Sequence, residues 1–240
     1  MPPPGGASVS DLLETAARLF RASALKCLPA GMLAVLCAQL PNVYWLASGH
    51  RLSFGAEYDA TYDVLAMAGT IVELWLLAAM MLRQRALVLG APISAGAELR
   101  AALLRLPVIL VSSLLAGLST LAGLLLLLAP GVFLMVCYLV LLPVLLFEGL
   151  SPYAALLHSV QLIRRVWWKA LAAFIIAVLV FMVCAIVLAA VLGIAAALLS
   201  GDAPVFAALE TACTVAFGAL FLVYLSALML VLHSAASSSA

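Results

Sequence analysis

Glu73 is the residue whose type and position could most directly do chemistry, because it is the only ionisable residue near the middle of a long apolar stretch. A charged side chain at that depth in a bilayer costs on the order of 2.5–3.5 kcal/mol. The carboxyl is therefore expected to face other helices or to be protonated. It could act as a proton or cation relay, or contact a polar substrate. It could equally be a neutral carboxyl that is hydrogen-bonded between helices.

An intramembrane lipid enzyme would need several polar groups that converge at one depth. Gln39 and Asn42 are the only residues that the sequence offers to join Glu73 in such a site. The sequence contains no HExxH, GxSxG or P-loop motif, and no cluster of His, Cys and carboxylate residues that could hold a metal. We therefore expect no enzymatic activity, no cofactor and no metal.

The histidines and cysteines do not form a recognisable site either. His50, His158 and His233 fall in different segments, which the charge pattern below places on both sides of a membrane, so the three are not expected to form a site together. The five cysteines lie within apolar runs and show no CxxC spacing. They are interpreted as small bilayer or core residues, because a buried free Cys behaves as a compact hydrophobe.

The elements that position these residues are apolar helices. The chain has 68% hydrophobic and 9% charged residues and a mean hydropathy of +1.31, whereas soluble domains have roughly 45–50% apolar and about 25% charged residues. About 20 apolar residues cross a bilayer as a helix. The sequence predicts an all-α integral membrane protein with six transmembrane helices, over residues 25–48, 64–82, 103–128, 131–147, 170–199 and 204–233.

Ten of the eleven Lys and Arg residues lie in three blocks, which are the N-terminal segment, residues 83–105 and residues 164–169. Cytoplasmic loops carry an excess of Lys and Arg. The blocks are therefore placed in the cytoplasm, and Arg51 is the one basic residue on the outer side. This pattern predicts that both termini are inside, and it gives no support to nucleic-acid binding. One domain is expected over residues 10–233, with a flexible lead over 1–9 and a short polar tail over 234–240.

Each cytoplasmic block is also predicted to form an amphipathic interfacial helix, before spans 1, 3 and 5. In the last of these, Ser151 and Pro152 suit the N-cap and first position of a helix, and apolar residues recur at helical spacing. The basic side chains of the three helices are candidates for contact with anionic lipid or with a membrane or cytoplasmic protein partner. These candidates are Arg18, Arg21, Arg100, Arg105, Arg164, Arg165 and Lys169.

Two features could serve helix movement or packing. Pro143 lies within the fourth span, where it frees a backbone carbonyl and could act as a hinge. Small residues at a spacing of four in the fifth span let helix backbones approach closely, and they are Ala185, Ala189, Gly193 and Ala197. Their expected use is contact with the sixth span, with homodimerisation as the alternative, and the sequence does not determine the oligomeric state.

Two segments carry a resemblance to a known family, SVSDLLETAARLFRASALKCLP and PGVFLMVCYLVLLPVLLFEGLSPYAALLHSVQLIRRVWWKAL. They resemble the YciC-like bacterial inner-membrane proteins and the related membrane domain of some glycerophosphodiester phosphodiesterases. In that group a Pro-Gly turn begins a span that proline interrupts, and a polar turn and a helix with a basic, Trp-rich end follow. The matching residues here are Pro130, Gly131, Pro143, Glu148, Gly149, Ser151, Ser159, Arg164, Trp167 and Lys169.

The resemblance implies a protein of the bacterial cytoplasmic membrane with a role in envelope maintenance. The catalytic barrel of some relatives has no counterpart here, because no soluble segment is long enough to form one. The resulting hypothesis is a non-enzymatic protein that acts through its basic cytoplasmic helices on lipid or a partner. The alternative is a transporter subunit, either a permease similar in layout to the ABC-2 type that works with a separate ATPase, or a small secondary transporter that uses Glu73.

Overall fold

The computed structural model describes residues 8–50, 58–91, 94–199 and 203–238, and every element in these ranges is helical. The elements are α1 (Val9–Ala47), α2 (Ala60–Val88), α3 (Ala95–Leu126), α4 (Leu128–Cys137), the 3₁₀ turn η1 (Tyr138–Val140), α5 (Leu141–Glu148), α6 (Pro152–Arg164), α7 (Trp167–Leu199) and α8 (Ala203–Ser237). The expected N-terminal lead (residues 1–9) and C-terminal tail (residues 234–240) lie partly outside these ranges. Within them, helix already begins at Val9, and α8 continues four residues beyond His233.

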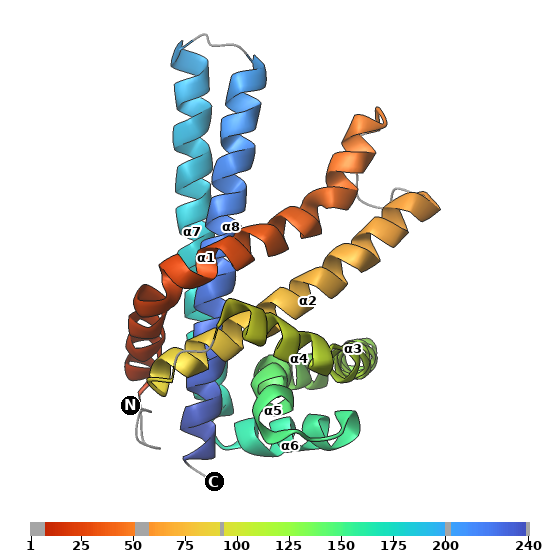
Figure 1. Ribbon diagram of the computed structural model, residues 1–240, viewed down its shortest axis with the longest axis vertical. Coiled ribbons are helices and arrows are strands. Elements are labelled where there is room, and N and C mark those ends of the chain that lie inside the picture. Colours follow the sequence, from red (N-terminus) through yellow and green to blue (C-terminus); the bar gives the residue numbers. More distant parts are fainter. Residues whose placement is uncertain (1–7, 51–57, 92–93, 200–202, 239–240) are drawn as a thin grey trace.

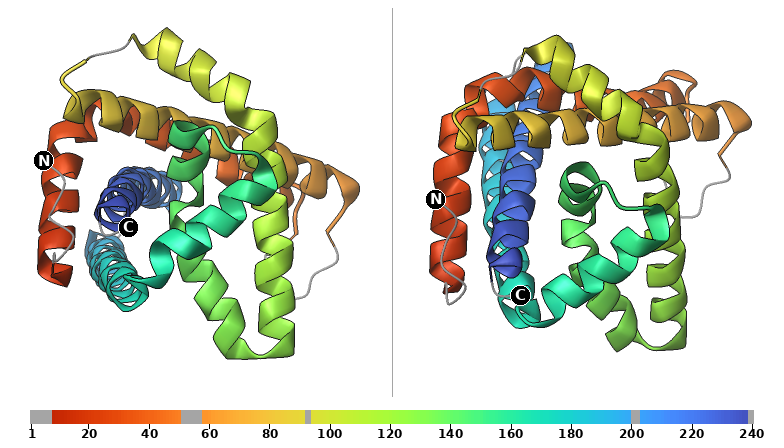
Figure 2. Two further views of the ribbon diagram at one scale, coloured as in Figure 1. Left: turned by 90° about the horizontal axis from the view of Figure 1, so that it is seen from below. Right: turned by 60° about the horizontal axis from the view of Figure 1, so that its bottom comes forward.

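The long helices form three hairpins, α1–α2, α3–α4 and α7–α8, which diverge from a shared base (Figures 1 and 2). The base contains α5, α6 and the C-terminal half of α8. Helix α1 crosses the α7–α8 hairpin before it runs beside α2, and it packs closely against both α2 and α8. The described ends of the chain both lie near the base (Figure 1).

Six helices in the described part of the chain are long and apolar enough to cross a membrane, as predicted. The fourth is composite, because α4, η1 and α5 follow one another over Leu128–Glu148. It is also the most enclosed, since 61% of the residues in its most apolar stretch are buried, against 6% for α7. The enclosed part of the fourth helix is η1 and most of α5, where residues 139–146 are buried, whereas α7 leaves most of its surface for lipid.

The turn between α3 and α4 comes before Pro130 and Gly131 in the chain, not at this pair. The chain reverses at Leu127, which has extended backbone angles (φ −160°, ψ 140°), and Pro130 and Gly131 lie inside α4. Proline is tolerated in the first turn of a helix, where its missing N–H would have no partner. A Cβ at Gly131 would lie 2.6 Å from the backbone nitrogen of Leu124, so the close return of α4 onto α3 requires glycine at this position.

The first and second interfacial helices are not separate elements, which corrects the sequence-based expectation. Residues 9–47 form one helix with Pro29 and Pro41 inside it, and α3 likewise runs through Pro107. Proline removes one helical hydrogen bond and bends a helix without necessarily ending it, and α1 changes direction in its N-terminal half (Figure 1). The third helix, α6, is separate and begins at Pro152 after Ser151, as predicted.

Helix α6 buries one face against protein. Its buried residues are Ala155, Leu156, Ser159, Leu162 and Ile163, and its neighbours include α3, α4 and α5. Of the apolar side chains at helical spacing in α6, Leu156 is buried against protein, whereas Tyr153 and Leu157 are exposed and stay available to the interface. Gly149 lets the chain turn from α5 into α6, because it adopts a left-handed conformation (φ 66°) directly after α5.

Candidate functional site

The three polar residues predicted to share an intramembrane site do not converge. The Asn42 side-chain amide donates to Gln39 Oε1 (2.8 Å), and the Tyr62 hydroxyl donates to Asn42 Oδ1 (3.0 Å). Glu73 is eleven residues beyond Tyr62 on α2, which is about 16 Å along a helix. Asn42, whose amide is also bonded to Gln39, therefore links α1 to α2 near the free end of this hairpin, and Glu73 lies deeper.

Glu73 is half-buried, and no hydrogen bond or ion pair joins it to another residue in the described ranges. It lies seven residues before Met80, so it shares a face of α2 with that fully buried side chain. The interhelical hydrogen bond expected for a neutral carboxyl is not formed with a described residue. A relay or substrate contact at Glu73 stays a prediction.

Aromatic side chains close the free end of the α1–α2 hairpin. Tyr58 and Tyr62 stack at 4.0 Å between ring centroids, and Trp45 meets Tyr58 edge-on at 4.9 Å. Beside them, the Tyr62 backbone N–H and the Tyr44 hydroxyl donate to Asp59, and they lower the pKa of this carboxyl below its ordinary value of 3.8. Aromatic and hydrogen-bonding groups of this kind are typical of the level where a membrane helix meets water.

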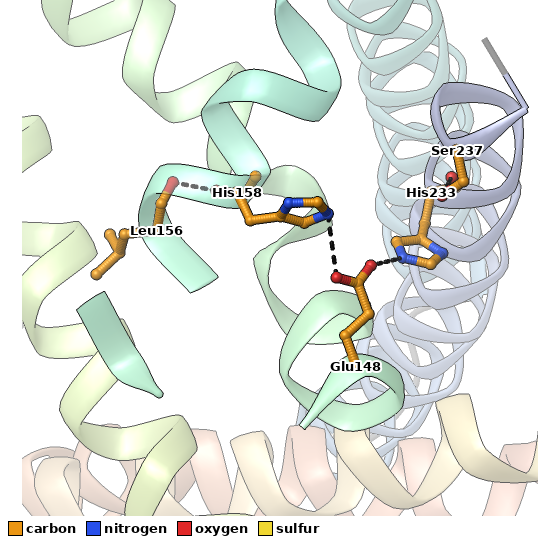
Figure 3. A network of polar contacts seen from close by, with 6 residues as sticks. Glu148, Leu156, His158, His233 and Ser237 are labelled. Carbon is orange, nitrogen blue, oxygen red and sulfur yellow. Dashed lines mark hydrogen bonds and ion pairs between the residues drawn. The ribbon is translucent and has the colours of Figure 1, made fainter. Parts of the chain in front are cut away.

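A cluster of ionisable groups that sequence reasoning missed lies at the base. Glu148, at the end of α5, accepts a contact from His158 Nε2 on α6 at Oε2 (3.0 Å) and one from His233 Nε2 on α8 at Oε1 (2.9 Å) (Figure 3). The expectation that the three histidines form no common site holds for His50, but two of them share one carboxylate. No local motif predicts this cluster, because its members come from three helices; the turn at Gly149 brings α6 back to α5, and His233 comes from α8.

Two arginines extend the contacts around this cluster. The Arg85 guanidinium on α2 lies 4.0 Å from the ring centroid of Phe147, and this ring meets His233 edge-on at 6.1 Å. The Arg105 guanidinium on α3 approaches Gly149. The cluster therefore ties α2, α3, α5, α6 and α8 together. In the described ranges, no three His, Cys, Asp or Glu residues are arranged to hold a metal ion.

A cavity of about 260 Å³ lies between α1, α2 and α3. At its polar end Arg83 Nε donates to Glu98 Oε2 (2.6 Å), and Arg83 Nη1 donates to the backbone carbonyl of Lys26 (2.5 Å). Glu98 is only 3% exposed, so the ion pair is largely removed from solvent. The lining residues are Lys26, Cys27, Pro29, Ala30, Leu33, Leu76, Ala79, Met80, Arg83, Glu98 and Leu99.

Each wall of this cavity is held in place by a polar contact between helices. The Trp75 indole N–H on α2 donates to the backbone carbonyl of Leu99 on α3 (2.9 Å). Arg83 bridges from α2 to both α1 and α3. On the far side of α2, the buried Gln84 amide donates to the backbone carbonyl of Val223 on α8 (3.0 Å). The cavity is therefore a fixed feature of the α1–α2–α3 arrangement.

The basic residues predicted to contact lipid or a partner are mostly accessible. Six of them are exposed and Lys169 is half-buried; the exposed ones are Arg18, Arg21, Arg100, Arg105, Arg164 and Arg165. Arg18 pairs with Glu14 at 3.1 Å on the surface of α1, where both side chains are about two-thirds exposed. Such a surface pair contributes little stability, so Arg18 can exchange this partner for another anion.

The predicted hinge residue is buried, whereas the predicted packing residues are mostly exposed. Pro143 is buried in α5, directly after the 3₁₀ turn Tyr138–Val140, where the helix tightens as expected close to a proline. Ala185 is half-buried, but Ala189 and Gly193 are exposed, and the side chain of Ala197 lies outside the described part. Around Gly193 nothing lies within 4 Å of an added Cβ.

The α7–α8 hairpin is joined by aromatic rings at the position where the small-residue pattern is interrupted. Phe181 lies 5.5 Å from Phe217 and 5.0 Å from Phe221 between ring centroids, and 5.5 Å from Tyr224. Since a spacing of four residues advances about 40° around a helix, the small residues drift away from this contact. Large rings at Phe181 therefore hold α7 and α8 together one turn before the small residues begin at Ala185.

Comparison of this chain with known family models, with curated proteins and with solved structures finds no match.

Proposed function

We propose that this chain is a non-enzymatic, multi-pass protein of the bacterial cytoplasmic membrane that contributes to envelope maintenance by binding anionic lipid. The observation that carries this proposal is the set of exposed arginines on α1, α3 and α6, each of which precedes or begins a long apolar helix. Each Lys or Arg near a membrane surface contributes about 1 kcal/mol of attraction to anionic lipid. Several together give a clear preference over zwitterionic lipid.

The proposed orientation places both termini in the cytoplasm. Ten of eleven basic residues then lie on the inner side, as the positive-inside rule requires. In this orientation the basic residues face the leaflet whose lipids are anionic. The aromatic group at Trp45 and Tyr58 then lies at the outer surface.

The test is the lipid composition that the purified protein retains. Extraction in mild detergent, followed by native mass spectrometry, should give more bound phosphatidylglycerol than phosphatidylethanolamine. Substituting two arginines, in Arg18→Gln/Arg21→Gln, removes about 2 kcal/mol of attraction and should lower this preference roughly 30-fold. Arg51→Gln is the matched control, because the proposed orientation places Arg51 outside.

Other outcomes favour other functions. Equal retention of both lipids by the native chain would contradict lipid binding through the arginines. A nucleotide-binding ATPase that co-purifies in stoichiometric amount would favour the permease alternative. A soluble partner that is lost from the Arg18→Gln/Arg21→Gln variant would favour protein docking on the same side chains.

Secondary transport is a second candidate, and the half-buried Glu73 favours it because no described residue pairs with this carboxyl. An ionisable group at membrane depth is a frequent mark of a proton or ion pathway. Proteoliposomes containing the protein should then carry a proton-driven flux that Glu73→Gln abolishes. Absence of proton movement in response to a pH gradient would count against this candidate.

A further inference from the structure

We propose that the cavity between α1, α2 and α3 is a binding site for one anionic phospholipid, whose acyl chain lies along the apolar wall and whose phosphate lies at Lys26. This inference rests on the proposed preference for anionic lipid and assigns it a specific site. The exposed arginines would attract lipid generally, whereas the cavity would hold one molecule in a defined place.

The apolar part of the cavity suits a hydrocarbon chain. Its walls are Leu33 on α1, Leu76, Ala79 and Met80 on α2, and Leu99 on α3. Leu33 is 49% exposed, so the cavity opens sideways to the surface that would face the bilayer. Its volume of about 260 Å³ is just below the roughly 300–1,000 Å³ of typical ligand sites. The site can therefore enclose part of one chain while the remainder stays in the membrane.

The polar end of the cavity determines the charge of the ligand. Arg83 and Glu98 offset each other in their 2.6 Å ion pair. Lys26 is exposed at the same end, and no carboxylate in the described ranges lies within ion-pair distance of its ammonium group. The net charge at the mouth of the cavity is therefore positive, which favours an anionic headgroup over a zwitterionic one.

Arg83 supplies further donors for that headgroup. A guanidinium has five N–H donors, and the contacts with Glu98 and with the Lys26 carbonyl engage Nε and Nη1. Arg83 is 24% exposed, so part of its side chain stays accessible from the cavity. A phosphate at Lys26 can accept from both residues, because a tetrahedral phosphate offers several acceptor oxygens. A fatty-acid carboxylate has fewer acceptors, which is why a phospholipid is the assigned ligand.

The test is a titration of delipidated protein in detergent with phosphatidylglycerol, followed by native mass spectrometry. One molecule should bind with clearly higher affinity than the rest. Lys26→Gln removes one cation and should weaken this first binding step about five-fold, since about 1 kcal/mol corresponds to that factor. Ala30→Trp fills the cavity and should abolish the step. Arg85→Gln removes a cation that lies outside the cavity and outside the set of lipid-contacting arginines, so it should leave this step unchanged.

The outcomes separate this inference from the proposed function. If Lys26→Gln and a folded Ala30→Trp both keep the tight first step while the native chain still prefers anionic lipid, the cavity assignment is wrong and the general function stands. If the native chain shows no preference for phosphatidylglycerol, the proposed function fails. Oleate that displaces the first phosphatidylglycerol at equal concentration would overturn the choice of phospholipid. Because Lys26 is exposed, Lys26→Gln should fold even if Ala30→Trp does not.

Discussion

The close approach of α1 and α2 at Gly69 predicts the effect of a single methyl group. Helices α1 and α2 approach so closely at Gly69 that a Cβ built there would lie 2.6 Å from the backbone carbonyl oxygen of Cys37 and 3.2 Å from its carbonyl carbon. An ordinary contact begins at 3.4 Å, so the two backbones would have to separate by 0.8 Å, the difference between 3.4 and 2.6 Å. The obstacle is backbone, so no side chain can rotate away to relieve it.

Gly69→Ala should therefore destabilise the protein. Overpacking a tight contact costs about 1–3 kcal/mol, and replacing a helical glycine by alanine returns about 0.5–1 kcal/mol. The expected net loss is about 1–2 kcal/mol. For a chain of this size, each kcal/mol lowers the midpoint of thermal unfolding by about 2–4 °C, so the Tm should fall by about 2–8 °C.

The assay is thermal unfolding in one detergent, with Gly117→Ala as the matched control. Gly117 lies within α3, and an added Cβ there meets nothing within 4 Å, so this variant should keep or slightly raise the Tm. A Gly69→Ala protein that is as stable as Gly117→Ala would refute the close approach of α1 and α2. The Gln39, Asn42 and Tyr62 contacts would then need another explanation.

Two further substitutions probe the polar contacts. Glu98→Gln leaves the partly buried Arg83 without its counter-charge. Breaking a buried ion pair costs about 3–5 kcal/mol, and the partial exposure of Arg83 reduces the expected loss of stability to about 2–3 kcal/mol. The Tm should fall accordingly, and an unchanged Tm would contradict this expectation. Glu148→Gln keeps one acceptor but loses the charge shared by His158 and His233, and at this exposure the cost should be about 1 kcal/mol. Limited proteolysis should then cut the turn between α5 and α6 faster, and an unaltered cleavage rate would show that the cluster does not hold these helices.

The six apolar helices could be predicted from the sequence because bilayer-length apolar runs leave few alternatives. The limits of individual helices could not. Proline often marks a helix boundary, yet α1 and α3 continue through Pro29 and Pro107. Proline removes one helical hydrogen bond, and whether the helix ends there depends on the tertiary contacts around it.

The polar sites were less accessible to sequence reasoning. Glu73 could be singled out because its charge is unusual at that depth. The contacts of Glu148 with His158 and His233 could not, because they depend on how three helices return to the base. The cavity beside Arg83 depends on the spacing between α1 and α3, which no pattern within one helix reports.

The most direct test of the account is the sidedness of the chain in intact cells. In a variant without the five native cysteines, a single cysteine in place of Ser8, Ser48, Ser151 or Ser237 can be labelled with a membrane-impermeant maleimide. All four side chains are exposed. Six crossings with both termini inside predict labelling of the Ser48 variant in intact cells, and of the other three only after permeabilisation. Labelling at Ser8 or Ser237 in intact cells would contradict the orientation on which the proposed lipid contacts depend.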